Sequence, residues 1–285
     1  MKRMVRDILA VLLAATLAPL ALAAGEDETA TGTQGSAGGG IEPDASNWNL
    51  GIGLGYGLRS NPLIQSDDIP ILVDLDIAWF GEHWFFDNGD VGLTVSDNDR
   101  FTLNVVGRFN SDRVFFGRTD TRIVQVGAGT GAVVDVEVTV PDRDYAIEAG
   151  AELLAGGRWG LLQFSAFHDL SGTHEGFSLA ADYSYGFRQQ RWYLEPAVRV
   201  SFKSSRLNDY YWGVQPDEAS LVLPAYGADS GINVGLRLLG SYQLTRDWAV
   251  TAVVEYERLN DETADSPIVD EDHVIGYFAG FAYRF

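Results

Sequence analysis

The chain has 285 residues, 46% of them hydrophobic, and a formal net charge of −20 at pH 7, which argues against a protein that binds nucleic acid. Mean hydropathy is −0.03, and beyond the N-terminus no run of about 18 apolar residues could form a membrane-spanning helix. The sequence contains no cysteine, which excludes disulfides, thiolate metal sites and a lipid-modified cysteine.

The N-terminus has the features of a secretory signal peptide. Lys2, Arg3 and Arg6 precede an apolar core that ends in the small-residue pattern Ala21-Leu22-Ala23. This pattern predicts a signal peptide over residues 1–23, with cleavage between Ala23 and Ala24. Residues 24–47 are rich in Gly, Ser, Thr and acidic residues, so we expect a disordered periplasmic lead-in.

Residues 48–58 show the clearest strand pattern in the chain. Apolar or aromatic side chains at every even position from Trp48 to Leu58 alternate with Asn49 and glycines. Side chains of a strand point alternately to its two faces. The pattern therefore predicts a strand with one apolar and one small face. A membrane barrel turns such an apolar face to lipid.

The same alternation returns along the rest of the chain. It is found in residues 71–79, 101–109, 145–153, 177–187, 192–202, 232–242 and 248–256. These stretches are longer than the five or six residues of an average strand in a soluble protein. Pro196 lies within one of them and has no N–H to donate, so we expect a β-bulge there.

The alternation also assigns faces within each strand. We expect Leu179, Tyr183, Leu236 and Val250 to face lipid, and Asp182, Arg237 and Thr251 to face the lumen. Inward positions carry both signs of charge, so either ion pairs close the lumen or a narrow wet pore remains.

Short and long connections alternate in the second half of the chain. Short turns are expected at residues 156–157, 189–190 and 245–247, and long polar loops at residues 59–68, 110–142, 204–229 and 260–272. Asn88-Gly89 is typical of a type I′ hairpin turn. We predict an all-β fold, an antiparallel transmembrane β-barrel over residues 48–285, with about twelve strands and 10–14 possible. Residues 122–140 form either a hairpin in the longest loop or two further strands.

The last ten residues end in an aromatic strand. Phe281, Tyr283 and Phe285 share one face, and this ending resembles the signal by which the barrel assembly machinery recognises outer-membrane barrels. Lipid and lipopolysaccharide of the outer membrane are the further partners that such a barrel implies, whereas nucleic acid is not expected as a partner.

One cluster has residues of catalytic type: His168, Asp169, Ser171, His174 and Glu175. Asp, Ser and Gly are ordinary turn residues, and no Gly-x-Ser-x-Gly elbow is present. We therefore predict no catalytic residues, no cofactor and no metal ligands, and an outer-membrane hydrolase is the weakest alternative. Acidic residues in the long loops predict a solvated surface, with divalent bridging to lipopolysaccharide phosphates as the alternative.

Several segments resemble the MipA/OmpV family of outer-membrane proteins. They are Leu207-Asn-Asp-Tyr-Tyr-Trp-Gly-Val214, residues 168–176, Ser266-Pro-Ile-Val269 and the C-terminal strand. The family-motif positions are Leu207, Asn208, Asp209, Tyr210, Tyr211 and Gly213. Trp212 departs from the pattern, which leads us to expect a tyrosine there.

The resemblance implies a non-enzymatic outer-membrane barrel. The founding member of the family is described as a scaffold that joins a lytic murein transglycosylase to a bifunctional penicillin-binding protein, and other members resemble adhesins or porins. We therefore expect a scaffold for murein-synthesising and murein-hydrolysing enzymes. A narrow passive channel or a surface adhesin is the alternative.

Overall fold

The computed structural model describes residues 48–118, 122–127 and 133–285 of the chain. The predicted signal peptide, its cleavage site at Ala23 and Ala24 and the predicted lead-in lie outside these residues. Among the helices of the described part, none is long and apolar enough to cross a membrane.

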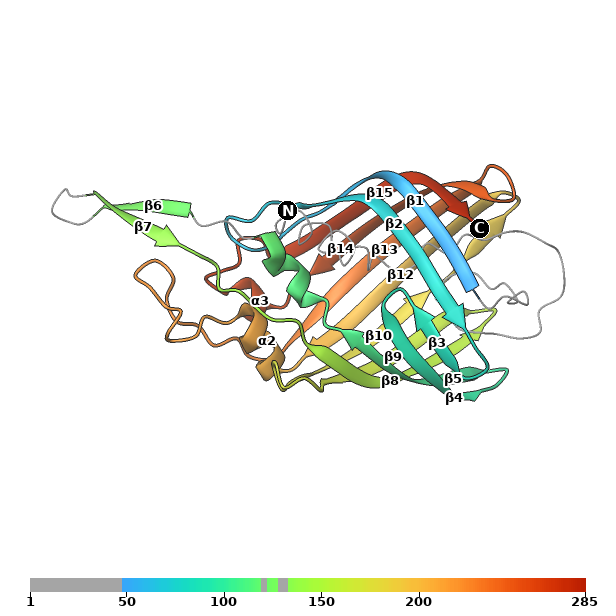
Figure 1. The fold of residues 1–285 in the computed structure, drawn as a ribbon, viewed down its shortest axis with the longest axis horizontal. Helices are drawn as coiled ribbons and strands as arrows, with labels where there is room; N and C mark the ends of the chain where they lie inside the picture. The colour runs from blue at the N-terminus through green and yellow to red at the C-terminus, as the bar shows by residue number, and fades with distance from the viewer. Residues whose placement is uncertain (1–47, 119–121, 128–132) are drawn as a thin grey trace.

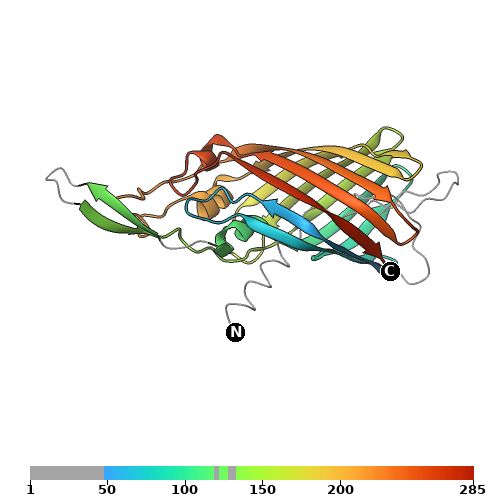
Figure 2. The ribbon, with the colours of Figure 1, turned by 90° about the horizontal axis from the view of Figure 1, so that it is seen from above.

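The described strands form a closed antiparallel β-barrel (Figures 1 and 2). They are β1 (Trp48–Arg59), β2 (Ile69–Phe80), β3 (Trp84–Asp87), β4 (Asp90–Asp97), β5 (Phe101–Phe109), β8 (Ile147–Gly157), β9 (Gly160–Asp169), β10 (Phe177–Ser184), β11 (Phe187–Gln189), β12 (Trp192–Lys203), β13 (Gly231–Gln243), β14 (Trp248–Arg258) and β15 (His273–Arg284). β1 pairs with β15, and β10 and β11 follow one another along β12. The segments therefore make twelve barrel strands, as predicted.

Two further strands, β6 (Arg122–Gly127) and β7 (Val133–Val138), pair only with each other. Figure 1 shows this hairpin projecting away from the barrel. Of the two predictions for residues 122–140, the hairpin in the longest loop is therefore confirmed, and the fourteen-strand barrel is wrong.

The two ends of the barrel differ. The end that carries the long loops, called the loop end, also holds η1 (Asp112–Arg118), α2 (Ser205–Trp212) and α3 (Asp261–Ala264). The other end, called the turn end, has short connections and the C-terminus (Figure 1). Because bacterial barrels place short turns in the periplasm, we assign the turn end to the periplasm and the loop end to the cell exterior.

Two predicted turns can be compared with the observed ones. Asn88 and Gly89 have φ angles of 48° and 106°, and a type I′ turn requires two such positive angles. The turn expected at residues 156–157 is two residues too early. β8 runs through Gly157, and the chain reverses at Arg158 and Trp159, because Gly160 takes the positive φ of 116°.

The prediction of a β-bulge at Pro196 is also wrong. Pairing of β12 with β13 runs through Pro196 and Leu238 without a shift in register. The missing N–H is accommodated on the other side, where the neighbouring strand is interrupted between β10 and β11. There Tyr185 N–H still donates to Pro196 O at 3.1 Å.

The predicted faces are confirmed in the tested strands. Leu179, Tyr183, Leu236 and Val250 are exposed on the outer face, whereas Thr251 is buried inside. Ile71 is an exception to the alternation, because it is buried inside at 3% exposure. The register shifts by one residue between the pairs Leu54–Val73 and Gly57–Ile71, which turns Ile71 inward.

Leu236→Arg is expected to lower the free energy of unfolding from bilayers by about 2–4 kcal/mol, the cost of an arginine on the lipid face near the midplane. Leu236→Met at the same position is the control, and should cost less than about 1.5 kcal/mol. Urea-dependent refolding into liposomes measures both. Equal losses would show that the outer face of β13 is wrongly assigned.

Candidate interaction surfaces at the two ends of the barrel

A packed cluster covers the loop end, and we call it the cap. Its buried members come from the loops after β1, β5, β12 and β14, which start at separate places around the barrel, and from the loop-end residues of β2 and β15. They are Leu63, Ile69, Phe115, Phe116, Val140, Leu207, Tyr211, Trp212, Val214, Leu223, Leu259, Ile268 and Val274. Because loops from different sides of the barrel pack together there, the cap lies across the mouth.

Trp212 lies at the centre of the cap. Its residue is 0% exposed, and its ring centroid lies 5.8 Å from that of Phe115 and 5.7 Å from that of Phe116. Ser266 Oγ donates to the Trp212 carbonyl. The departure from the family motif at this position therefore lies at the centre of the packing, beside the rings of Phe115 and Phe116.

The family-motif residues form α2 and its C-terminal cap. Leu207, Asn208 and Tyr211 are buried, and Asn208 Nδ2 donates to Asp229 O at 2.8 Å. Gly213 N–H donates to Asp209 O, and a Cβ on Gly213 would lie 2.3 Å from that oxygen. Only glycine fits so close an approach, so these residues hold the cap together.

A buried ion pair ties the loop before β8 to the cap. Arg143 NH1 and NH2 donate to the two carboxylate oxygens of Glu218 at 2.6 and 3.0 Å, and Arg143 NH2 also donates to Gly213 O at 3.0 Å. Partial burial raises the pKa of Glu218, but the bonds from Arg143 and from Gln215 N–H outweigh it and hold that pKa below its usual range. Tyr210 accepts a bond from Asp144 N–H, and burial raises the pKa of neighbouring Tyr211.

A second polar network lies beneath the cap. The side chain of Glu148 is 0% exposed and accepts bonds from Arg108 Nε at 3.0 Å and Asn110 Nδ2 at 2.8 Å. His174 Nε2 lies 3.3 Å from Glu148 Oε1, without the geometry of a hydrogen bond. Nearby, Lys203 Nζ bonds both oxygens of Asp112 at 2.7 and 2.8 Å.

The loop with catalytic-type residues is organised by Asp169. Its carboxylate accepts bonds from Ser171 N–H and Oγ, His174 N–H and Glu175 N–H. Ser171 Oγ contacts Thr173 Oγ1, and His174 Nδ1 accepts a bond from Gly176 N–H. Ser171 and His174 therefore do not bond each other. His168 Nδ1 contacts Asp169 O. The geometry is that of an ordered turn.

The turn end carries a basic surface that sequence reasoning missed. Arg158, Arg191 and Arg246 lie in three successive turns on neighbouring hairpins, Arg188 lies in β11 beside one of these turns, and all four are exposed. Within the described residues, none of the four forms an ion pair with a carboxylate. Exposed tryptophans, among them Trp159, Trp192 and Trp248, lie beside these turns. We call the four arginines the turn-end arginines.

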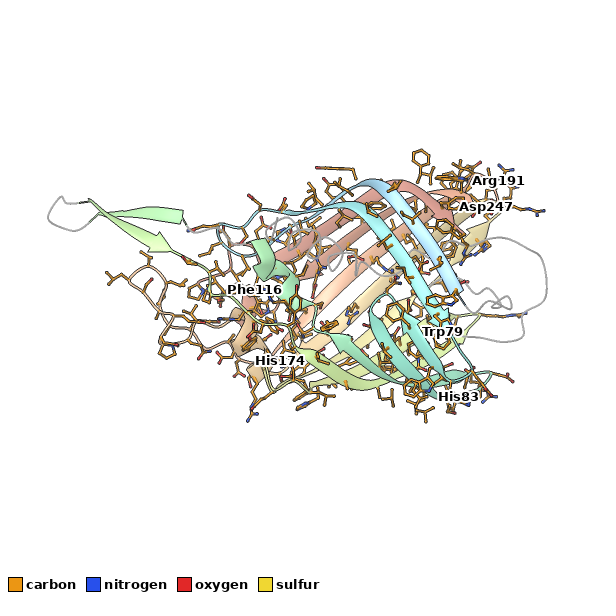
Figure 3. The ribbon with its side chains drawn as sticks, viewed as in Figure 1. Trp79, His83, Phe116, His174, Arg191 and Asp247 are labelled. Carbon is orange, nitrogen blue, oxygen red and sulfur yellow. The ribbon has the colours of Figure 1, made fainter. Side chains whose placement is uncertain are left out.

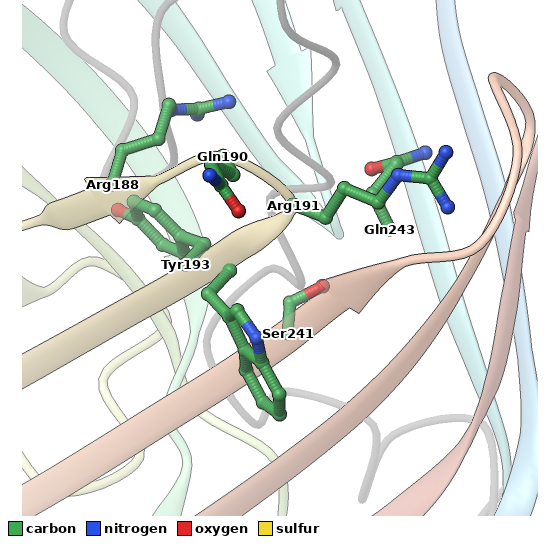
Figure 4. Close-up of a pocket in the computed structure, with 7 residues that line it drawn as sticks. Arg188, Gln190, Arg191, Tyr193, Ser241 and Gln243 are labelled. Atoms are coloured by element: carbon green, nitrogen blue, oxygen red, sulfur yellow. The ribbon is translucent and has the colours of Figure 1, made fainter.

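Two of the turn-end arginines line a shallow pocket (Figure 4). Arg188, Gln190 and Arg191 surround it together with the inward-facing Tyr193, Ser241 and Gln243. Arg188 Cζ lies over the Tyr193 ring, 5.4 Å from the ring centroid. Figure 3 shows Arg191 and Asp247 at this end and His174 and Phe116 at the other.

The predicted acidic surface lies at the loop end. Asp67, Asp68, Asp261, Asp265, Asp270 and Glu271 are exposed there, while Glu262 and Asp272 are partly buried. No group of three or more His, Cys, Asp or Glu residues in the described ranges is arranged to hold a metal ion.

Phe281 and Phe285 are exposed on β15 and beyond it, and the ring centroids of Tyr283 and Trp248 are 4.9 Å apart. Their role as an assembly signal stays a prediction.

Known proteins resemble this chain in sequence and fold. Outer membrane protein OmpV of Vibrio cholerae is 30% identical over 60% of this chain and 69% of its own length. The MltA-interacting protein of Escherichia coli K12 is 28% identical over 50% of this chain and 58% of its own. The NanC porin structure matches 83% of this chain and 100% of that one with a TM-score of 0.39 and 11% identity, a likeness too weak to support a shared function.

The family model of the MltA-interacting protein MipA matches residues 19–285. This match includes the whole barrel, the cap with the motif of α2, and the C-terminal strand. With relatives named as outer-membrane proteins and a closed barrel of twelve strands, the chain is an outer-membrane barrel. It belongs to the MipA family, the family of the MltA-interacting protein.

Proposed function

We propose that this protein is a non-enzymatic scaffold that brings a lytic transglycosylase together with a penicillin-binding protein on the periplasmic side of the outer membrane. The observation that carries the proposal is the cap, whose packed side chains cover the loop-end mouth. A covered mouth favours an interaction protein over an open channel. The name of the Escherichia coli relative supports a transglycosylase as one partner.

The turn-end arginines supply the binding surface in this proposal. In a chain of net charge −20, four exposed arginines without carboxylate partners among the described residues outnumber Asp247, the exposed acid of the same turns, and form a local field of opposite sign. Such a field steers a partner with an acidic patch and suppresses wrong partners. The loop-end acids would contact lipopolysaccharide, and Phe281, Tyr283 and Phe285 would contact the assembly machinery.

Reversing the charge of Arg158, Arg188, Arg191 and Arg246 to Glu is expected to reduce recovery of the transglycosylase about tenfold, because complementary charges then repel. The measurement is affinity purification of the full chain from cross-linked envelopes, with quantitative mass spectrometry of the bound murein enzymes.

The matched control reverses Arg206 and Arg258, which lie at the loop end and pair with Glu175 and Asp272. It should leave recovery unchanged. Equal recovery with the turn-end variant and the wild type would contradict the proposed surface. Absence of any murein enzyme from the wild-type sample would contradict the scaffold itself.

A narrow channel is the second candidate. It is favoured by inward carboxylates along the barrel, among them Asp74, Asp76, Glu152 and Asp182, which would suit small cations if water passed the cap. Steady ohmic conductance of the purified wild-type chain in planar bilayers would support this candidate.

A further inference from the structure

The wall of the barrel is incomplete beside β2. β3 pairs with β2 only at Ala78, Trp79 and Phe80, although β2 continues to Ile69. At Ile77 the turn of the β3–β4 hairpin takes over: Asn88 N–H donates to Ile77 O, and Ile77 N–H donates to Asn88 Oδ1, both at 3.0 Å. Beyond this point, residues 69–76 have no strand neighbour on that side among the described residues.

The incomplete stretch is bounded on every side, and we call it the window. Its lower boundary is the hairpin turn at Asn88 and Gly89, and one side is β2. On the other side β4 pairs with β5 as far as Val91 and Gly107. At the top, η1 follows β5 and reaches the β1–β2 loop, where Asn61 Nδ2 donates to Phe115 O at 2.9 Å. Figure 1 shows η1 beside the outer end of β2.

The window lies at the level of the membrane. Val73 pairs with Leu54 and Ile77 pairs with Leu50 across β1, and both leucines are exposed on the outer face. Because alternate residues of an antiparallel strand direct N–H and C=O to the same side, Val73 and Leu75 direct theirs into the window, as Ile77 does. Open sheet edges do not face hydrocarbon, because each unsatisfied group costs several kcal/mol. Polar groups of an occupant or of water must therefore enter the window.

The window joins two unlike environments. Leu72 and Phe109 are 54% and 52% exposed on its outer side. Carboxylates line its inner side, where Asn88 Nδ2 donates to Asp76 at 3.4 Å and to Asp87 at 2.9 Å. Asp74 is 6% exposed and has no hydrogen bond or ion pair in the described part of the chain. A buried carboxylate without a partner is stabilised by protonation, by a hydrogen-bond donor or by a cation.

We propose that the window is a lateral portal through which a cationic amphiphile passes from the membrane to the acidic lumen. The ammonium group would lie between Asp74 and Asp76, and the tail would lie against Leu72 and Phe109 in the lipid. The cationic head supplies the partner that Asp74 lacks, and water around the head reaches the open edge of β2. This portal is independent of the scaffold and of the turn-end arginines.

The first test is binding of two probes with the same tail to the full chain in detergent, titrated by native mass spectrometry. Dodecyltrimethylammonium is expected to bind about tenfold more tightly than dodecyl sulfate, and Asp74→Asn should remove about tenfold of that affinity. Asp182→Asn is the control, because Asp182 is an inward carboxylate paired with Arg199. Where Asp74→Asn fails to fold, Asp76→Asn replaces it. Equal affinity for both probes, or equal loss in the control, overturns the portal.

The second test is residue-resolved amide hydrogen exchange in nanodiscs. The amides of Val73 and Leu75 should exchange faster than those of Val250 and Val254, which lie in β14 between two paired strands. Dodecyltrimethylammonium should slow the exchange at Val73 and Leu75. Protection of these two amides without any probe would mean that the wall is closed there, and would overturn the portal.

Discussion

Arg108→Met is expected to lower the free energy of unfolding by about 3–5 kcal/mol, the cost of leaving a buried charge without its partner. The Glu148 side chain is 0% exposed, and Arg108 Nε lies 3.0 Å from its Oε2. Asn110 bonds only the other oxygen, Oε1, so the variant leaves Oε2 without that donor. Methionine keeps an apolar side chain near Phe167, whose ring centroid lies 3.6 Å from Arg108 Cζ.

The control is Arg199→Met, which removes an inward arginine from an exposed pair. Arg199 NH1 lies 3.3 Å from Asp182 Oδ1, and the two side chains are 50% and 30% exposed. Such pairs contribute between about 0 and 1 kcal/mol. Urea unfolding in liposomes measures both variants. Equal losses would mean that water reaches Glu148 as freely as Asp182.

A double variant separates the lost attraction from the buried charge. Arg108→Met with Glu148→Leu removes both partners, and replacing a buried pair by apolar residues is often neutral. We expect the double variant to recover most of the stability that Arg108→Met loses. A double variant as unstable as the single one would show that Arg108 acts through its contact with Phe167 instead.

The faces of the strands could be predicted because they depend on local alternation. Leu236 and Thr251 follow from a period of two along one strand, with no knowledge of the neighbouring strand. Ile71 could not be predicted this way, because its direction depends on a register shift against β1. The window was missed for a related reason. Alternation does not reveal how far along β2 the short β3 will pair.

The sequence also could not predict which inward-facing charged side chains pair with each other. Arg108 and Glu148 are 40 positions apart and face each other across the pairing of β5 with β8. Lys203 and Asp112 are 91 positions apart and meet because η1 places Asp112 near the end of β12. The motif of α2 was visible as a resemblance, but its place in the cap depends on loops from four separate strands. The turn-end arginines are visible singly in the sequence, and only the order of the hairpins makes them one surface.

Trp212→Ala is expected to cost about 3–5 kcal/mol, the range for deleting a large aromatic side chain from a packed core. Trp212 is 0% exposed between Phe115 and Phe116, so the variant leaves a cavity at the centre of the cap. The barrel strands keep their pairing, because their hydrogen bonds do not involve this side chain. Loops of the cap should therefore loosen while the barrel persists.

This difference can be measured in two ways on the same protein. Limited proteolysis of the variant in liposomes should cut the cap loops and spare the barrel, and planar-bilayer recordings should show new conductance where the wild type shows none. Leu221→Ala is the control, because Leu221 is in the same loop region but 97% exposed. Conductance of the wild type itself would contradict a closed cap. A cut but non-conducting variant would place the barrier deeper, at the inward cluster of Ile71, Tyr193, Leu239, Val253 and Phe278.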